Sequence, residues 1–104
     1  MSKQGVIKSS QLEQRRDGEK VIVAGLKVVL YTLPTRSGRR VVFITLEDED
    51  GLVDITVFPD VQQKCAMTLF GRNALLVEGR VQRMYPRSLT LVASKVAPLS
   101  LAAG

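Results

Sequence analysis

The sequence predicts an all-β domain: five strands that close into a barrel, with one helix between the third and the fourth strand. Runs of β-branched and aliphatic residues with a period of two recur along the chain, separated by turn residues. One stretch, residues 59–71, changes to a helical period, and a glycine interrupts the unusually long first run. The five predicted strands are residues 20–34, 41–46, 52–58, 73–84 and 88–99.

Length and composition indicate one folded domain. The chain has 104 residues, 45% of them hydrophobic, which is enough for a single core. We assign the domain to residues 9–99 and expect flexible termini over 1–8 and 100–104. No apolar run is long enough to span a membrane, and a single cysteine allows no internal disulfide. We therefore expect a protein of a reducing cytosol, with no membrane partner and an oligomeric state that the sequence leaves open.

The residue inventory argues against catalysis. The chain has no histidine and one cysteine, so neither the usual zinc sites nor a Ser–His or Cys–His nucleophile can be built. We predict no enzymatic activity, no cofactor and no metal. The 15 Lys and Arg residues against 10 Asp and Glu give a net charge of +5, which suits a polyanionic partner.

The chain opens with a short predicted helix. Ser9 and Ser10 are candidate N-caps, Glu13 is placed to complete a capping box from Ser10, and Gly18 ends the helix. In the long strand that follows, the apolar parity switches at Gly25. A glycine at that point predicts a bulge or a sharp coil that lets one strand serve two sheet surfaces.

The stretch "VVFITLEDEDG", residues 41–51, has apolar side chains on both faces of one strand. The set Val42, Ile44 and Leu46 is predicted to face the core, which leaves Val41, Phe43 and Thr45 on the outside. The acidic residues 47–50 are interpreted as a solvated hairpin turn that ends at a glycine, because consecutive carboxylates on a tight turn cannot converge on a metal.

Residues 59–71 are predicted to form a helix that plugs one end of the barrel. Pro59 suits the first helical position, Val61, Cys65 and Leu69 recur every four residues, and Gly71 ends the pattern. We interpret Cys65 as a buried apolar residue. Three strands, a helix and two strands, with a glycine-coiled first strand, match the OB-fold, a partly open Greek-key barrel.

Residues 9–99 also resemble a known family. The segments "VIVAGLKVVLYTLP", "GRRVVFITLEDEDGLVDITVFPDV", "ALLVEGRVQR" and "LTLVASKVAPL" are similar to nucleic-acid-binding OB domains of the anticodon-binding type. The similarity is closest to the OB domain near the C-terminus of the bacterial DNA polymerase III alpha subunit and its error-prone relative. The resemblance implies that Phe43 stacks on a base; Asp54 stands where the anticodon-binding relatives often carry glutamine.

On this fold the outer face of the first three strands would carry unpaired bases, because aromatic rings stack on bases of any sequence. The alternative for Phe43 is cover by a terminal segment or a partner subunit, and Phe58 is interpreted as a core residue. The residues placed on this face are Lys27, Val29 and Tyr31 from the first strand, Val41, Phe43 and Thr45 from the second, and Asp54 and Thr56 from the third.

Arginines collect in the two loops that flank this face. Guanidinium groups pair with phosphates and stack on bases, so these loops are predicted to follow a phosphate backbone; the alternative is a set of solvated loop charges. The first loop region contains Arg36, Arg39 and Arg40, and the second contains Arg80, Arg83 and Arg87 around Tyr85.

The sequence therefore predicts a module that binds single-stranded DNA with weak sequence preference, accessory to replication or repair synthesis. A protein-interaction or oligomerisation module is the second hypothesis, and RNA binding is the third. Replication or repair proteins are possible partners. The predicted nucleic-acid-binding residues are Lys27, Tyr31, Arg36, Arg39, Arg40, Phe43, Thr56, Arg80, Arg83, Tyr85 and Arg87.

Overall fold

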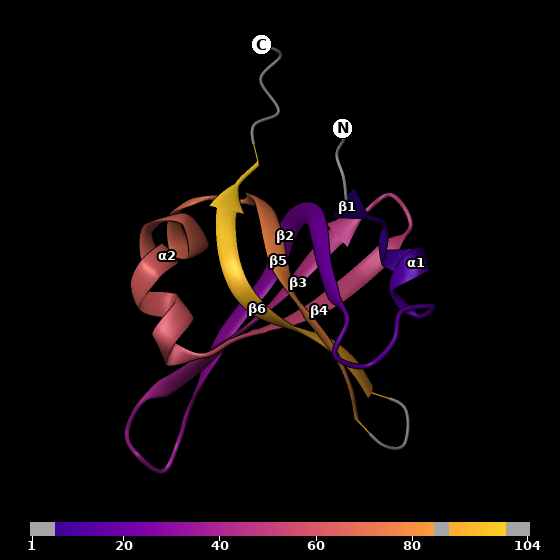
Figure 1. Ribbon diagram of the computed structural model, residues 1–104. Coiled ribbons are helices and arrows are strands. Elements are labelled where there is room, and N and C mark those ends of the chain that lie inside the picture. Colours follow the sequence, from indigo (N-terminus) through magenta and orange to yellow (C-terminus); the bar gives the residue numbers. More distant parts are fainter. Residues whose placement is uncertain (1–5, 85–87, 100–104) are drawn as a thin grey trace.

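The computed structural model describes residues 6–84 and 88–99, and it confirms the predicted OB-fold barrel (Figure 1). Strands β2 to β6 lie in the order β2-β3-β4-β6-β5, and β5 pairs back to β2 to close the ring. The β4–β6 pair is parallel. The elements are β1 (Val6–Ile7), α1 (Ser9–Leu12), β2 (Lys20–Pro34), β3 (Arg40–Asp48), β4 (Gly51–Val57), α2 (Pro59–Gly71), β5 (Ala74–Met84) and β6 (Ser88–Pro98).

Strand β2 makes closure possible because it pairs with two neighbours in turn. Residues 20–26 pair with β5, and residues 26–34 pair with β3. A Cβ at Gly25 would lie 2.6 Å from the carbonyl oxygen of Glu47, so only glycine allows the two strands to approach this closely. The predicted change of sheet surface at Gly25 is confirmed. The bulge itself lies further along, between Lys27 and Val29.

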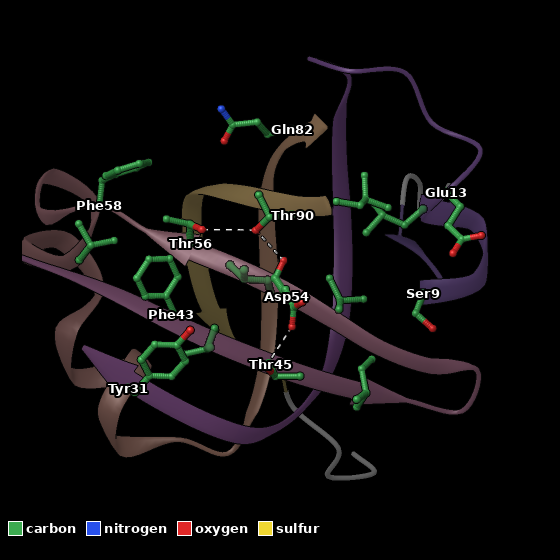
Figure 2. Close-up of a pocket in the computed structure, with 17 residues that line it drawn as sticks. Ser9, Glu13, Tyr31, Phe43, Thr45, Asp54, Thr56, Phe58, Gln82 and Thr90 are labelled. Atoms are coloured by element: carbon green, nitrogen blue, oxygen red, sulfur yellow. Dashed lines mark hydrogen bonds between the residues drawn. The ribbon is translucent and has the colours of Figure 1, made fainter. Parts of the chain in front are cut away.

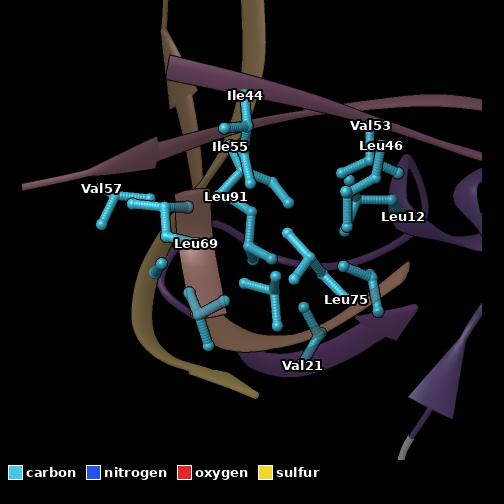
Figure 3. Close-up of a cluster of buried hydrophobic side chains, with 14 of the residues drawn as sticks. Leu12, Val21, Ile44, Leu46, Val53, Ile55, Val57, Leu69, Leu75 and Leu91 are labelled. Atoms are coloured by element: carbon cyan, nitrogen blue, oxygen red, sulfur yellow. The ribbon is translucent and has the colours of Figure 1, made fainter. Parts of the chain in front are cut away.

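The core fills the barrel and is closed at opposite sides by residues of the two helices (Figure 3). Leu69 of α2 and Leu12 of α1 are both buried in it. Every predicted core position of β3 is buried, but Val41, which was predicted to lie outside, is buried as well. The buried residues of the two central strands are Val42, Ile44 and Leu46 on β3 and Val53, Ile55 and Val57 on β4.

Helix α2 has the predicted bounds, with Pro59 in its first turn and Gly71 at its end. Its backbone leaves helical geometry at Cys65, and the thiol donates to the carbonyl oxygen of Val61 over 3.1 Å. Burial raises the pKa of the Cys65 thiol, as expected for a buried apolar residue. Within residues 6–84 and 88–99, no helix is long and apolar enough to cross a membrane.

The first helix differs from the prediction. It ends at Leu12 instead of near Gly18, and its cap is formed by Gln11, whose Oε1 accepts from the backbone N–H of Lys8 over 2.9 Å. The predicted capping box between Ser10 and Glu13 is wrong. The physical reason is competition, because the serine hydroxyls find stronger, charged acceptors elsewhere in the fold.

Those acceptors are the carboxylates of the turn between β3 and β4, predicted to be solvated. The backbone N–H and the hydroxyl of Ser9 both donate to Asp48, over 2.7 and 2.8 Å, and the hydroxyl of Ser10 donates to Asp50 over 2.6 Å. Immediately before α1, Ile7 of β1 is buried and pairs with Val23 of β2. Among the described residues, no group of three His, Cys, Asp or Glu side chains could hold a metal.

These contacts predict a loss of stability in acid. Burial opposes ionisation of Asp48, but hydrogen bonds from Ser9 and from the backbone N–H groups of Asp50 and Gly51 outweigh it and hold the Asp48 pKa below its ordinary value of 3.8. A lowered folded pKa stabilises the fold above the unfolded value, and this contribution disappears as pH falls through the folded value. Denaturant midpoints measured from pH 7 into that acid range should fall more for the wild type than for Asp48→Asn. Equal acid sensitivity would contradict this.

Candidate nucleic-acid interface

The register of three strands places most of the predicted residues on one outward face. Tyr31 of β2 pairs with Phe43 of β3, which pairs in turn with Thr56 of β4. A second row, parallel to the first, consists of Val29, Thr45 and Asp54. Because paired residues point to the same side of a sheet, these two rows form one surface, here called the platform.

The aromatic centre of the platform is a stacked pair. The ring centroids of Tyr31 and Phe43 lie 5.3 Å apart with 23° between their planes. Tyr31 is 51% exposed, whereas Phe43 is only partly exposed. Phe43 is thus packed against a residue of the platform itself. The pair presents a preformed apolar surface to solvent.

Phe58 extends this surface, which corrects its assignment to the core. It is 45% exposed and lies on the same side as Phe43 and Tyr31 (Figure 2). Parity along β4 explains the position: Asp54 and Thr56 face outward, and Phe58 follows two residues later. The alternation of the strand already predicts that Phe58 faces outward. Phe58 was assigned to the core because α2 starts at the next residue.

Hydrogen bonds hold the polar residues of the platform in place beside the rings. Thr45 donates to Oδ1 of Asp54 over 3.2 Å, and Thr90 of β6 donates to the backbone carbonyl of Asp54 over 3.1 Å. A hydroxyl has one proton, so Thr56 is the donor in its 3.3 Å contact with Thr90. Thr56 is itself buried, so little of its side chain is accessible to the predicted nucleic-acid ligand.

A groove of about 850 Å³ runs over the platform. The three aromatic rings lie at one end of it, and Ser9 and Glu13 of the N-terminal segment lie at the other (Figure 2). Gln82 of β5 and Leu89 and Thr90 of β6 also line it. Sequence reasoning missed these three, because only barrel closure brings β5 and β6 next to the outer face of β4.

Lys27 does not belong to the platform. Its ammonium donates to the carbonyl oxygen of Leu69 over 2.6 Å, near the end of α2. The bulge between Lys27 and Val29 is the reason: Lys27 pairs with the core residue Leu46, whereas Val29 pairs with the outward Thr45. Strict alternation along β2 predicts that Lys27 and Tyr31 point to the same side of the sheet. The extra residue of the bulge inverts this alternation, so Lys27 points away from the platform.

The arginines of the first loop lie together at the tip of the β2–β3 hairpin, which projects from the barrel at the lower left of Figure 1. Arg39 pairs with Asp60 over 3.1 Å, and Arg40 donates to the hydroxyl of Thr32 over 3.3 Å. Arg36 is exposed in the turn itself. Exposed ion pairs are weak, so these guanidinium groups remain available to phosphates.

The second arginine group has a different role. The guanidinium of Arg83 donates to the backbone carbonyls of Glu13 and Arg15, and its backbone N–H donates to Asp17 over 2.7 Å. Arg80 donates to the carbonyl oxygen of Gly18 over 3.0 Å. Both side chains therefore hold the segment between α1 and β2 against β5. The other two predicted residues of this loop, Tyr85 and Arg87, lie outside the described residues.

Comparison with known proteins identifies the family. The model of the OB-fold nucleic acid binding domain matches residues 4–99. The chain belongs to this family. The match confirms the family that the resemblance of the sequence implied.

Relatives of this chain include error-prone DNA polymerases. The chain is 46% identical over 85 residues to an error-prone DNA polymerase of Symbiobacterium thermophilum, which covers 80% of this chain and 8% of the relative. The chain thus spans less than a tenth of that polymerase, as one small binding domain.

Solved structures with low identity share the fold. RecG bound to a three-way DNA junction superposes with a TM-score of 0.69 at 20% identity, covering 92% of this chain and 13% of that one. A mitochondrial single-stranded DNA binding protein of S. cerevisiae gives a TM-score of 0.62 at 19% identity, covering 81% of this chain and 98% of that one.

Proposed function

We propose that this OB domain binds single-stranded DNA with weak sequence preference, as a non-catalytic accessory to replication or repair synthesis in the bacterial cytosol. The observation that carries the proposal is the exposed Tyr31–Phe43 stack with Phe58 beside it, at the end of a groove across β3 and β4. Exposed rings offer stacking surfaces to unpaired bases, and each stacked base contributes about 1–3 kcal/mol.

The positions of the charges support the same ligand. The arginines lie at the hairpin tip, beyond the aromatic end of the groove, and the carboxylates of residues 47–50 lie at the other end of β3. A phosphate backbone is attracted to the first end and repelled from the second. A strand of nucleic acid would therefore leave the groove over the hairpin tip, with its bases on the rings.

Fluorescence anisotropy with labelled oligonucleotides tests the proposal. Single-stranded DNA should bind, duplex DNA of the same sequence should bind more weakly, and affinity should fall steeply with salt. RNA of the same sequence tests the RNA alternative, because only contacts to the 2′-hydroxyl would separate the two ligands. If no single strand binds at low salt, the domain is not a nucleic-acid-binding module and the protein-interaction hypothesis replaces it.

The hairpin arginines give a sharper prediction. Changing Arg36, Arg39 and Arg40 together to alanine should weaken single-strand binding and flatten its salt dependence. Each lost phosphate contact removes about 0.7 from the slope of log K against log salt, so three contacts remove about 2. The matched control changes three exposed basic residues that do not line the groove, Lys64, Arg72 and Lys95. Equal slopes for both triple variants would show that the hairpin does not contact phosphates.

A further inference from the structure

The groove over the platform is acidic, although the ligand proposed for it is a polyanion. Among the described residues that line it, Glu13 and Asp54 carry carboxylates, and none is a lysine or an arginine. The arginines that suit phosphates lie outside the groove, at the tip of the β2–β3 hairpin. In a strand bound here, the part of the nucleotide that faces the groove is therefore the uncharged base, and the phosphates follow its rim.

Of the two carboxylates, Asp54 is the one beside the aromatic rings. Its strand partner, Thr45, follows Phe43 by two residues on β3, so Asp54 and Phe43 are diagonal neighbours on the same face of the sheet. Side chains in this relation lie about 7 Å apart. Glu13 lies at the opposite end of the groove (Figure 2). A base that stacks on Phe43 therefore directs one of its edges towards Asp54.

Asp54 is held in place and still has an oxygen to offer. Thr45 donates to Oδ1 over 3.2 Å, and Thr90 donates to the backbone carbonyl of Asp54 over 3.1 Å. Within residues 6–84 and 88–99, no hydrogen bond or ion pair engages Oδ2, and the side chain is exposed to the groove. A carboxylate accepts hydrogen bonds and donates none. Oδ2 is therefore available only to a ligand group that can donate.

The bases differ in what they present to such an acceptor. Cytosine, adenine and guanine each carry an exocyclic amino group, which donates hydrogen bonds. Thymine and uracil have carbonyl oxygens instead, on either side of a single ring N–H. A carbonyl oxygen that faces a carboxylate leaves both groups without a donor, and a polar group buried without a partner weakens binding. An acceptor at this position therefore separates the bases with an amino group from those without one.

We propose that Asp54 selects the base that stacks on Phe43, in favour of bases with an exocyclic amino group and against thymine and uracil. Oδ2 accepts from the amino group, and Thr45 positions the carboxylate for this contact. The inference rests on the proposed function, because a single strand must first bind in the groove. It concerns one base of the bound strand, so the overall sequence preference stays weak.

Homopolymers of deoxycytidine and deoxyuridine test the proposal, because the two bases share one ring and differ in the amino or carbonyl group at carbon 4. Fluorescence anisotropy at neutral pH should show that the wild type binds the cytosine strand about fivefold more tightly, or better. Asp54→Asn keeps the size of the side chain but can donate as well as accept, so it should bring this ratio close to one. Circular dichroism confirms that the variant folds.

The matched control is Glu13→Gln, which removes the same charge from the other end of the groove. Both variants repel phosphates less, and this change affects the two strands equally, so Glu13→Gln should keep the wild-type ratio. If the ratio falls equally in both variants, the charge of the groove and not Asp54 sets the preference, and the inference is wrong. A wild type that binds both strands equally, or an unchanged ratio in Asp54→Asn, also overturns it and leaves the proposed function intact. If neither strand binds, the proposed function fails and this inference fails with it.

Discussion

Phe43→Ala is expected to weaken binding to single-stranded DNA by about 1–3 kcal/mol, or roughly fivefold to more than a hundredfold. The substitution removes one ring of the stacked pair and leaves Tyr31 without its support. Because stacking releases no counterions, the loss should persist when salt has removed most of the electrostatic attraction. Anisotropy titrations at low and high salt measure both properties.

The stability of this variant is the second readout. A fully buried phenylalanine costs about 3–5 kcal/mol when truncated to alanine. Phe43 is only partly covered, by a neighbour whose ring pairing is worth about 0.5–1.5 kcal/mol, so denaturant melts should show a loss of about 1–2 kcal/mol. The matched control is Phe70→Ala, since Phe70 is 50% exposed on α2 and does not line the groove. It should bind as the wild type.

The outcome separates the hypotheses for Phe43. A variant that is strongly destabilised, yet binds DNA normally once folded, would make this ring a structural residue and refute the stacking role. A shift of Phe43→Ala towards monomer, with unchanged binding by the monomer, would instead assign the ring to a subunit interface. Loss of binding in a folded variant is the result that the platform predicts.

The barrel could be predicted from the sequence because its signals are local. Residues 59–71 contain a helical repeat bounded by Pro59 and Gly71, and α2 has these bounds. Strand parity likewise placed Ile44 and Leu46 in the core and Phe43 and Asp54 outside. Each of these assignments depends on residues within one element, so no knowledge of the tertiary arrangement was needed.

The predictions were wrong where the position of a side chain depends on contacts with a distant part of the chain. The bulge at Val28 has no signature in a β-branched run, and it turns Lys27 away from the platform towards α2. The role of Arg83 depends on carbonyls of residues about 70 positions earlier, which only the closed fold brings near. Ser9 and Ser10 are good caps in isolation, but Asp48 and Asp50 offer them charged acceptors from a distant turn.

Gly79 is a second example of a long-range requirement, and its substitution should have the largest effect on stability. A Cβ at this position would lie 2.2 Å from the carbonyl oxygen of Val92 on β6. Val92 cannot move aside, because it pairs with Arg80 of β5 on one side and Thr56 of β4 on the other. The sequence marks Gly79 only as a glycine inside a strand, a pattern compatible with many structures.

Gly79→Ala should therefore lower the free energy of unfolding by about 3 kcal/mol, the upper range for overpacking in a rigid site. For a domain of this size that is a large share of the total stability, and part of the protein should unfold at moderate temperature. Gly71→Ala is the matched control, because no atom lies within 4 Å of its added Cβ and its φ is not positive. Denaturant melts should place Gly71→Ala within about 1 kcal/mol of the wild type. If the two variants are equally stable, β5 and β6 are not as closely apposed at Gly79 as this strand pairing requires.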